Sequence, residues 1–210
     1  MSAAEGAAVA LSRWRTSPAR LARLLLGLWL FGAGEAFLIA GGLGNSPWTV
    51  LAEGIAGRTT LTIGLTTFLV GLAVLLAWIP LHERPGLGTV LNVIVLSIAI
   101  DVTLLLLGEP RALGWRVLAL LAGTALVGLG SGFYLTAALG PGPRDGWMTA
   151  LHRRTGRPVW LVRLAIEGAV LLAGWLLGGT VGVGTVVFAV LIGPAVDLGL
   201  RLTGGLRPHR

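Results

Sequence analysis

The feature that most constrains this chain is a series of six long apolar stretches separated by short polar segments. A helix needs about 20 mostly apolar residues to cross the hydrocarbon core of a bilayer. Apolar residues make up 55% of the chain and charged residues 12%, about half of the ~25% usual in soluble proteins. We therefore expect an all-α membrane protein. Its six transmembrane helices are predicted at Leu21–Leu43, Leu61–Leu81, Leu87–Leu107, Arg116–Leu139, Val159–Leu177 and Val183–Leu202.

The second half of the chain repeats the first. Residues 20–106 align without a gap with residues 116–202, at an offset of 96, and 28 of the 87 pairs are identical. Each copy holds three spans, an odd number, so the second copy enters the membrane from the opposite face. This predicts two inverted three-helix repeats, which many secondary transporters share, with their site at mid-depth between the repeats. A duplication that only built a stable bundle remains the alternative.

Arginine supplies all sixteen basic residues, and its distribution predicts the orientation. With a cytoplasmic N-terminus, twelve arginines fall on the inner side, three on the outer side, and one inside a span. Basic loops stay cytoplasmic, so both termini are expected there. The predicted organisation is a cytoplasmic segment 1–19, a first repeat 20–107, an outer loop 108–115, a second repeat 116–202 and a cytoplasmic tail 203–210.

A short helix is predicted after the first span of each repeat. Ser46 and Pro47 open the first, since serine suits the N-cap and proline the first helical position. Pro143, Arg144 and Asp145 open the second. Neither helix is long enough to cross the membrane, so each re-enters partway or lies at the interface. If they re-enter, their N-terminal ends face an anionic group and frame a substrate path.

Besides Glu167, which is four residues from Arg163, three acids lie inside predicted spans, where ionisable residues are costly and usually mark a pathway or a paired contact. Asp101 and Asp197 are equivalent in the two repeats, and we expect them to share a proton or cation near the midplane. Glu35 has no acidic counterpart, because Ser131 occupies the equivalent position. A carboxylic acid hydrogen-bonded to a neighbouring helix is the structural alternative for each of the three.

Other patterns favour structural roles. Arg163 and Glu167 are four residues apart in the fifth span and are expected to form an intramembrane ion pair. Glycines recur in the first and fourth spans, which predicts that these two spans cross closely. Seven of the eight tryptophans, Trp48 and Trp78 among them, fall near span ends and are expected to lie at the membrane interface.

Catalysis and cofactor binding are not expected. The chain has no cysteine, and its three histidines are scattered, so no set with metal-ligand spacing exists. The net charge of +7 does not indicate nucleic-acid binding, because the arginines lie between apolar runs rather than in a patch with interleaved aromatics.

Several segments resemble the YczE-type branch of the YczE/YyaS/YitT group of bacterial membrane proteins. The resemblance covers nearly the whole chain after residue 20 and implies a bacterial inner-membrane protein, without supplying a substrate or site residues. Its matching segments are 43–48, Arg84–Thr89, Leu139–Gly146, Arg153–Gly156 and Gly174–Gly182.

The sequence thus favours a transporter or permeation protein for a small solute or ion. Asp101, Asp197 and Glu35 are the predicted proton, cation or substrate ligands. The alternative is a membrane scaffold that assists a biosynthetic or secretion partner. Membrane lipids are the expected surroundings, and a homodimer is left open.

Overall fold

The computed structural model describes residues 13–108 and 112–204. Six segments in this part of the chain are long and apolar enough to cross a membrane, so the expected six spans are confirmed; α4 and α5 together form the second. The helices are α2 (Pro18–Gly41), α3 (Pro47–Ala56), α4 (Ile63–Leu76), α5 (Trp78–Leu81), α6 (Leu87–Leu107), α7 (Leu113–Ala137), α8 (Pro143–Thr155), α9 (Val159–Leu176) and α10 (Val183–Leu202).

Local chemistry determines where the helices begin and end. The hydroxyl of Ser17 accepts a hydrogen bond from an amide of the first turn of α2, and Pro18 occupies the first helical position. The C-cap of α2 is Gly42, whose φ of 58° lies in the left-handed region that glycine adopts without strain. Thr62 caps α4 in the same way as Ser17 caps α2.

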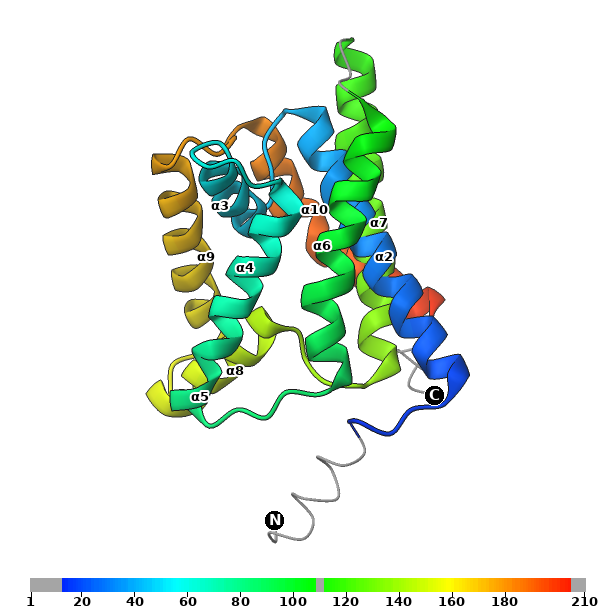
Figure 1. Cartoon of the computed structure of the whole chain (residues 1–210), viewed down its shortest axis with the longest axis vertical. Coiled ribbons are helices and arrows are strands. Elements are labelled where there is room, and N and C mark those ends of the chain that lie inside the picture. The colour runs from blue at the N-terminus through cyan, green and yellow to red at the C-terminus, as the bar shows by residue number, and fades with distance from the viewer. Residues whose placement is uncertain (1–12, 109–111, 205–210) are drawn as a thin grey trace, which may run out of the picture.

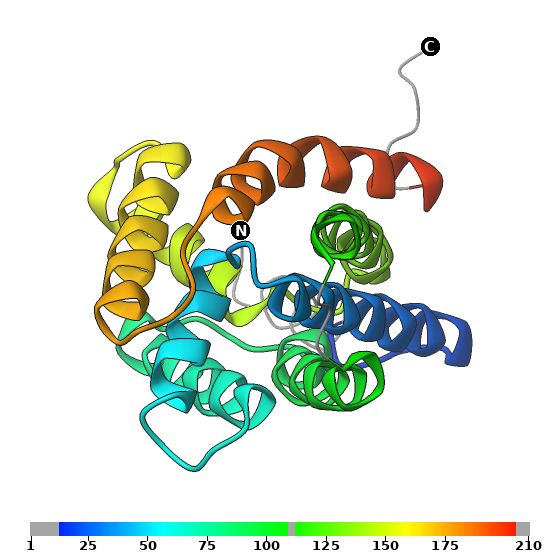
Figure 2. The same ribbon diagram turned by 90° about the horizontal axis from the view of Figure 1, so that it is seen from above.

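The spans form two groups. In one, α2 packs most extensively on α7, α6 lies on α2, and α10 lies on α7 (Figure 2). In the other, α9 packs on α3 and α8, and α4 packs on α3 and, more extensively, on α6 of the first group. The short helices lie toward opposite ends of the molecule, α3 near the upper end and α8 near the lower end in Figure 1. α2 begins and α10 ends at the lower end.

Glycines bring α2 and α7 close together, as the sequence predicts for the first and fourth spans. A methyl group at Gly27 would lie 2.8 Å from the carbonyl oxygen of Gly130, and one at Gly123 would lie 2.7 Å from that of Gly34. Both distances are shorter than carbon–oxygen packing allows, so these backbones meet only because the residues have no side chain.

Two equivalent arginines hold the ends of this helix pair. Arg20, in the first turn of α2, donates from Nη2 to the carbonyl oxygen of Ala137 at the end of α7 (2.9 Å). Arg116, in the first turn of α7, donates from Nε to the carbonyl oxygen of Gly41 at the end of α2 (2.7 Å). α2 and α7 therefore run antiparallel. A cation beside the last turn also complements the negative end of a helix.

Several long-range contacts between the two repeats are made twice by equivalent residues. Adding 96 to the residue number of the partner in the first repeat, and subtracting 96 from that of the partner in the second repeat, gives the second contact of each pair. These pairs of contacts are Arg20–Ala137 with Arg116–Gly41, Arg58–Leu176 with Arg154–Pro80, Gly184–Leu43 with Gly88–Leu139, and Gly27–Gly130 with Gly123–Gly34.

Two tryptophans expected at the interface are instead buried. Trp48 is 5% exposed and Trp78 is 2% exposed. The indole Nε1 of Trp78 donates to the carbonyl oxygen of Pro143 at 3.0 Å. The interface prediction was wrong for this pair because position along a span does not determine which side of the helix faces lipid.

Candidate functional site

A cavity of ≈ 250 Å³ lies between the two groups of spans, and the first residues of both short helices line it. Ser46, Pro47 and Trp48 reach it from the start of α3, and Pro143, Arg144 and Asp145 from the start of α8. The structure thus brings together the two turns that the sequence singled out. Other lining polar side chains are Glu35, Asn92, Ser131, Tyr134, Arg163 and Glu167.

Glu35 lies at the α3 side of the cavity and is 2% exposed. Its Oε2 accepts hydrogen bonds from the hydroxyls of Ser46 (2.9 Å) and Thr49 (2.7 Å). A buried carboxyl group is tolerated only with such partners. The Ser46 side chain makes no capping bond to α3, so the first amides of that helix have no side-chain acceptor there.

Arg144 lies on the α8 side with its guanidinium over the ring of Trp48, 4.8 Å from the ring centroid. Among the described residues no carboxylate oxygen lies within 4.0 Å of it, and it donates no hydrogen bond. The Nε1 of Trp48 and the hydroxyl of Tyr134 are buried and also have no partner in this part of the chain. Arg144 and the Trp48 Nε1 therefore present donors at the cavity that no protein acceptor among the described residues satisfies, whereas the Tyr134 hydroxyl faces Asp145.

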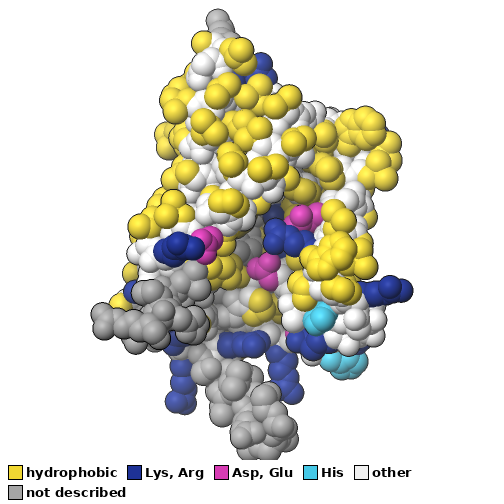
Figure 3. All heavy atoms as spheres, turned by 180° about the vertical axis from the view of Figure 1, so that it is seen from behind, with side chains coloured by type: hydrophobic (Ala, Val, Ile, Leu, Met, Phe, Trp, Pro, Cys, Tyr) yellow, Lys and Arg dark blue, Asp and Glu magenta, His cyan; other side chains and the backbone are white. Residues whose placement is uncertain are grey.

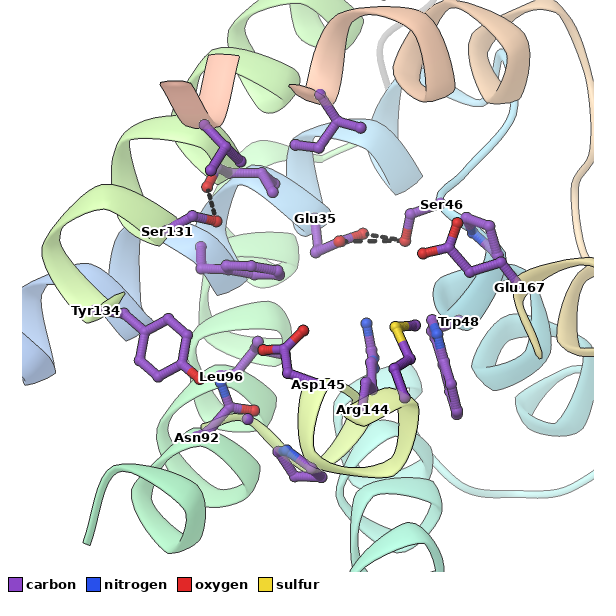
Figure 4. A pocket seen from close by; sticks show the side chains of 18 of the residues that line it. Glu35, Ser46, Trp48, Asn92, Leu96, Ser131, Tyr134, Arg144, Asp145 and Glu167 are labelled. Atoms are coloured by element: carbon purple, nitrogen blue, oxygen red, sulfur yellow. Dashed lines mark hydrogen bonds between the residues drawn. The ribbon is translucent and has the colours of Figure 1, made fainter. Parts of the chain in front are cut away.

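Asp145 follows Arg144 but points to the other side, toward Tyr134 (Figure 4). Successive helical residues diverge by about 100°, so the two charges stand apart. Asp145 lies outside the six spans and keeps exposed surface lining the cavity. Removal from bulk water raises the pKa of Asp145, while Arg144 and Arg163 oppose the shift.

Both short helices are anchored by polar contacts at least partly removed from solvent. Trp78 holds the first residue of α8 through the carbonyl oxygen of Pro143. On the other side Glu53 of α3 accepts a hydrogen bond from the amide of Thr180 (2.7 Å) and one from the side chain of Asn45 (2.9 Å). The two helix ends are thereby held in place against the cavity.

Arg163 and Glu167 line the cavity from α9. Arg163 Nε donates to Glu167 Oε1 at 2.9 Å, the ion pair anticipated from their spacing. The Arg163 side chain is 55% exposed. α9 packs on α3 and α8, whereas α10 packs on α7. From the face opposite to Figure 1, acidic and basic side chains lie in a recess between apolar surfaces (Figure 3).

Asp101 and Asp197 do not line the cavity. Asp101 accepts hydrogen bonds from the amide of Gly64 (2.8 Å) and the hydroxyl of Thr62, at the start of α4. Asp197 pairs with Arg201, one turn further along α10, at 2.8 Å. The expectation that the two aspartates share a proton or cation was therefore wrong. The start of α4 supplies the partners of Asp101, and the guanidinium of Arg201 supplies the partner of Asp197.

No group of three or more His, Asp or Glu residues in 13–108 or 112–204 is placed to hold a metal ion. The polar groups of the cavity are instead separated donors and acceptors. Groups arranged in this way suit a small ligand held by charge and hydrogen bonds.

The sequence from residue 18 to residue 201 matches the family of unknown function DUF6198. The chain belongs to this family. An uncharacterized protein of Haemophilus influenzae is 43% identical over 200 residues, which are 95% of this chain and 91% of the relative. The uncharacterized membrane protein YczE of Bacillus subtilis is 32% identical over 170 residues, 80% of this chain and 79% of YczE.

YyaS, another uncharacterized protein of B. subtilis, is 24% identical over 172 residues, 80% of this chain and 86% of YyaS. No solved structure matches the chain. The resemblance to YczE-type membrane proteins is therefore confirmed, and with six apolar helices this DUF6198 chain is a membrane protein.

Among the cavity residues of this DUF6198 chain that sequence reasoning missed are Tyr134 and Trp48. Tyr134 is the only tyrosine of the chain and lies inside a span, which was an available signal. Trp48 directly follows the proline that opens α3, so it sits in the first turn of a helix aimed into the protein. That Trp48 lines the cavity could not be predicted from its own segment, because the contact depends on the packing of α8, whose Arg144 lies over the Trp48 ring.

Proposed function

We propose that this protein is a secondary transporter or permeation protein for a small solute, and that the cavity is its binding site. The observation that carries the proposal is the meeting of two short-helix N-termini, one buried acid and one unpaired arginine at a single cavity inside the bundle. Discontinuous helices whose positive ends point at a central site are typical of secondary transporters.

The paired contacts support an inverted-repeat arrangement of the two halves. Arg20 and Arg116 make equivalent bonds at opposite ends of the α2–α7 pair, as a two-fold axis in the membrane plane requires. In such transporters the halves rock about the site and open it to each side in turn. We propose Glu35, which only the first repeat carries, as the group that binds a coupling proton or cation.

The orientation belongs to the same proposal. α2 begins and α10 ends at one end of the molecule (Figure 1), and twelve of the sixteen arginines fall on that side in the predicted topology. We propose that this end faces the cytoplasm of a bacterial cell and that the protein lies in the inner membrane.

Cysteine accessibility tests the proposal, since the chain has no cysteine of its own. Ser131 lines the cavity, is 6% exposed, and donates to the carbonyl oxygen of Val127 at 2.7 Å. Thr124 lies two turns earlier on α7, is 3% exposed, donates to Leu120 in the same way at 2.8 Å, and does not line the cavity. Ser131→Cys and Thr124→Cys are therefore a matched pair.

A membrane-impermeant methanethiosulfonate reagent is applied to right-side-out and to inside-out vesicles. We expect Ser131→Cys to react from both faces and Thr124→Cys from neither. Reaction of Ser131→Cys from one face only would indicate a closed vestibule and overturn transport. Protection from both faces would favour a membrane scaffold for a biosynthetic or secretion partner.

A further inference from the structure

The charges lining the cavity identify the kind of solute it is built for. They come from five residues, Glu35, Arg144, Asp145, Arg163 and Glu167. Glu35 is bound by two hydroxyls, and Arg163 and Glu167 are bound to each other. Arg144 and Asp145 remain, one of each sign, with no ion-pair partner among the described residues.

The unpaired charges have separate surroundings. Arg144 stands on the Trp48 side of the cavity, and Asp145 stands on the Tyr134 side, beneath Glu35 in Figure 4. Trp48 is 5% exposed and its Nε1 has no partner. A buried donor without a partner is unfavourable, so it points to an acceptor that arrives with a ligand. The first amides of α3 and α8 add further donors there.

The requirement for both signs follows from electrostatics. With a proton on Glu35, the role proposed above for it, the other lining side chains carry two positive and two negative charges. A simple anion or cation would add a net charge where the effective dielectric constant is low, which is unfavourable. A ligand with one charge of each sign adds none and pairs with both residues. The volume of ≈ 250 Å³ is below the roughly 300–1,000 Å³ of drug-sized sites, so the ligand is small.

We propose that the cavity binds a small zwitterion of amino-acid size, with its carboxylate against Arg144 and the Trp48 Nε1 and its ammonium group against Asp145. This inference rests on the proposed function and names the class of its substrate. Arg144 also stacks on the indole ring, which orients the planar guanidinium for a bidentate contact with a carboxylate.

Binding to the purified full chain in lipid nanodiscs tests the proposal by calorimetry. The probes are zwitterions of increasing charge separation, alanine, β-alanine and γ-aminobutyrate, each with matched ions that lack one charge. For alanine these are propionate and ethylammonium. We expect one zwitterion to bind at least roughly tenfold more tightly than both of its matched ions. Equal binding of a matched ion, or no binding of any zwitterion at high millimolar concentration, would overturn the proposal.

Variants assign the two contacts. Asp145→Asn is expected to remove the advantage of the zwitterion over the matched anion, and Arg144→Gln its advantage over the matched cation. Arg153→Gln is the control, because Arg153 lies on the same helix, is 57% exposed, and does not line the cavity. An equal loss in Arg153→Gln would contradict the assignment. The comparison of probes on the wild-type chain remains decisive if a variant fails to fold.

The outcome is separable from that of the accessibility experiment. If Ser131→Cys reacts from both faces while zwitterions show no preference, the transporter proposal stands and the substrate class falls. If zwitterions bind selectively while Ser131→Cys reacts from one face only, the ligand class stands and transport falls.

Discussion

Replacing Gly27 by alanine is expected to separate the two central helices. The added methyl group would lie 2.6 Å from the backbone nitrogen of Tyr134 and 2.8 Å from the carbonyl oxygen of Gly130. Both atoms belong to the α7 backbone, so no side-chain rotation relieves the contact, and α2 must move by several tenths of an ångström. Overpacking of this kind costs about 1–3 kcal/mol. The loss of close α2–α7 contact adds to that cost.

Gly168→Ala is the matched control, since Gly168 also lies in a span and nothing stands within 4 Å of an added methyl group. It is expected to be neutral or stabilising by up to about 1 kcal/mol, because alanine favours helix. The assay is reversible unfolding in mixed micelles by titration with dodecyl sulfate, followed by tryptophan fluorescence. If Gly27→Ala unfolds at the same dodecyl sulfate fraction as Gly168→Ala, the close crossing of α2 and α7 is wrong.

Further predictions concern helix ends, and the same unfolding assay measures each of them. Arg20→Gln and Arg116→Gln should each lower the free energy of unfolding by about 1–3 kcal/mol, because each variant loses charged hydrogen bonds to the last turn of the partner helix. Destabilisation by only one of the two substitutions would contradict the equivalence of the two arginines. Asp101→Asn should lower the free energy of unfolding by about 1–2 kcal/mol, since Asp101 caps α4. Asp197→Asn should change it by less than about 0.5 kcal/mol, since the Asp197 side chain is 47% exposed and forms only an i,i+4 ion pair. A larger effect of Asp197→Asn than of Asp101→Asn would refute both assignments. Ala138→Gly should stabilise by about 1 kcal/mol because its φ is 52°, and a destabilised variant would exclude backbone strain there.

Hydrophobic length and repeat symmetry were enough to predict the spans, the two short helices and the crossing of α2 with α7. These features depend on properties that the chain carries locally. The run length of apolar residues sets the number of spans, and glycines at Gly27 and Gly123 mark where backbones can meet. Proline at the first helical position, after Ser46 in α3 and after Gly142 in α8, marked the starts that meet at the cavity.

The partners of the acids inside the spans could not be predicted in the same way. Sequence position gives the depth of Asp101 in its span, but its partner is an amide 37 positions away at the start of α4. Which side of a helix faces a neighbour depends on the packing of all spans together. The same reason explains why Trp78, expected at the interface, instead binds the turn that presents Arg144.

Movement of a solute across a membrane by the purified protein is the most direct test of the account. Proteoliposomes are loaded with the small-molecule fraction of the expression host, and the external medium is analysed by mass spectrometry over time. We predict that at least one small solute leaves wild-type proteoliposomes faster than protein-free liposomes, and that Arg144→Gln abolishes the difference while Arg153→Gln preserves it. Identical release profiles with and without the protein would contradict the account.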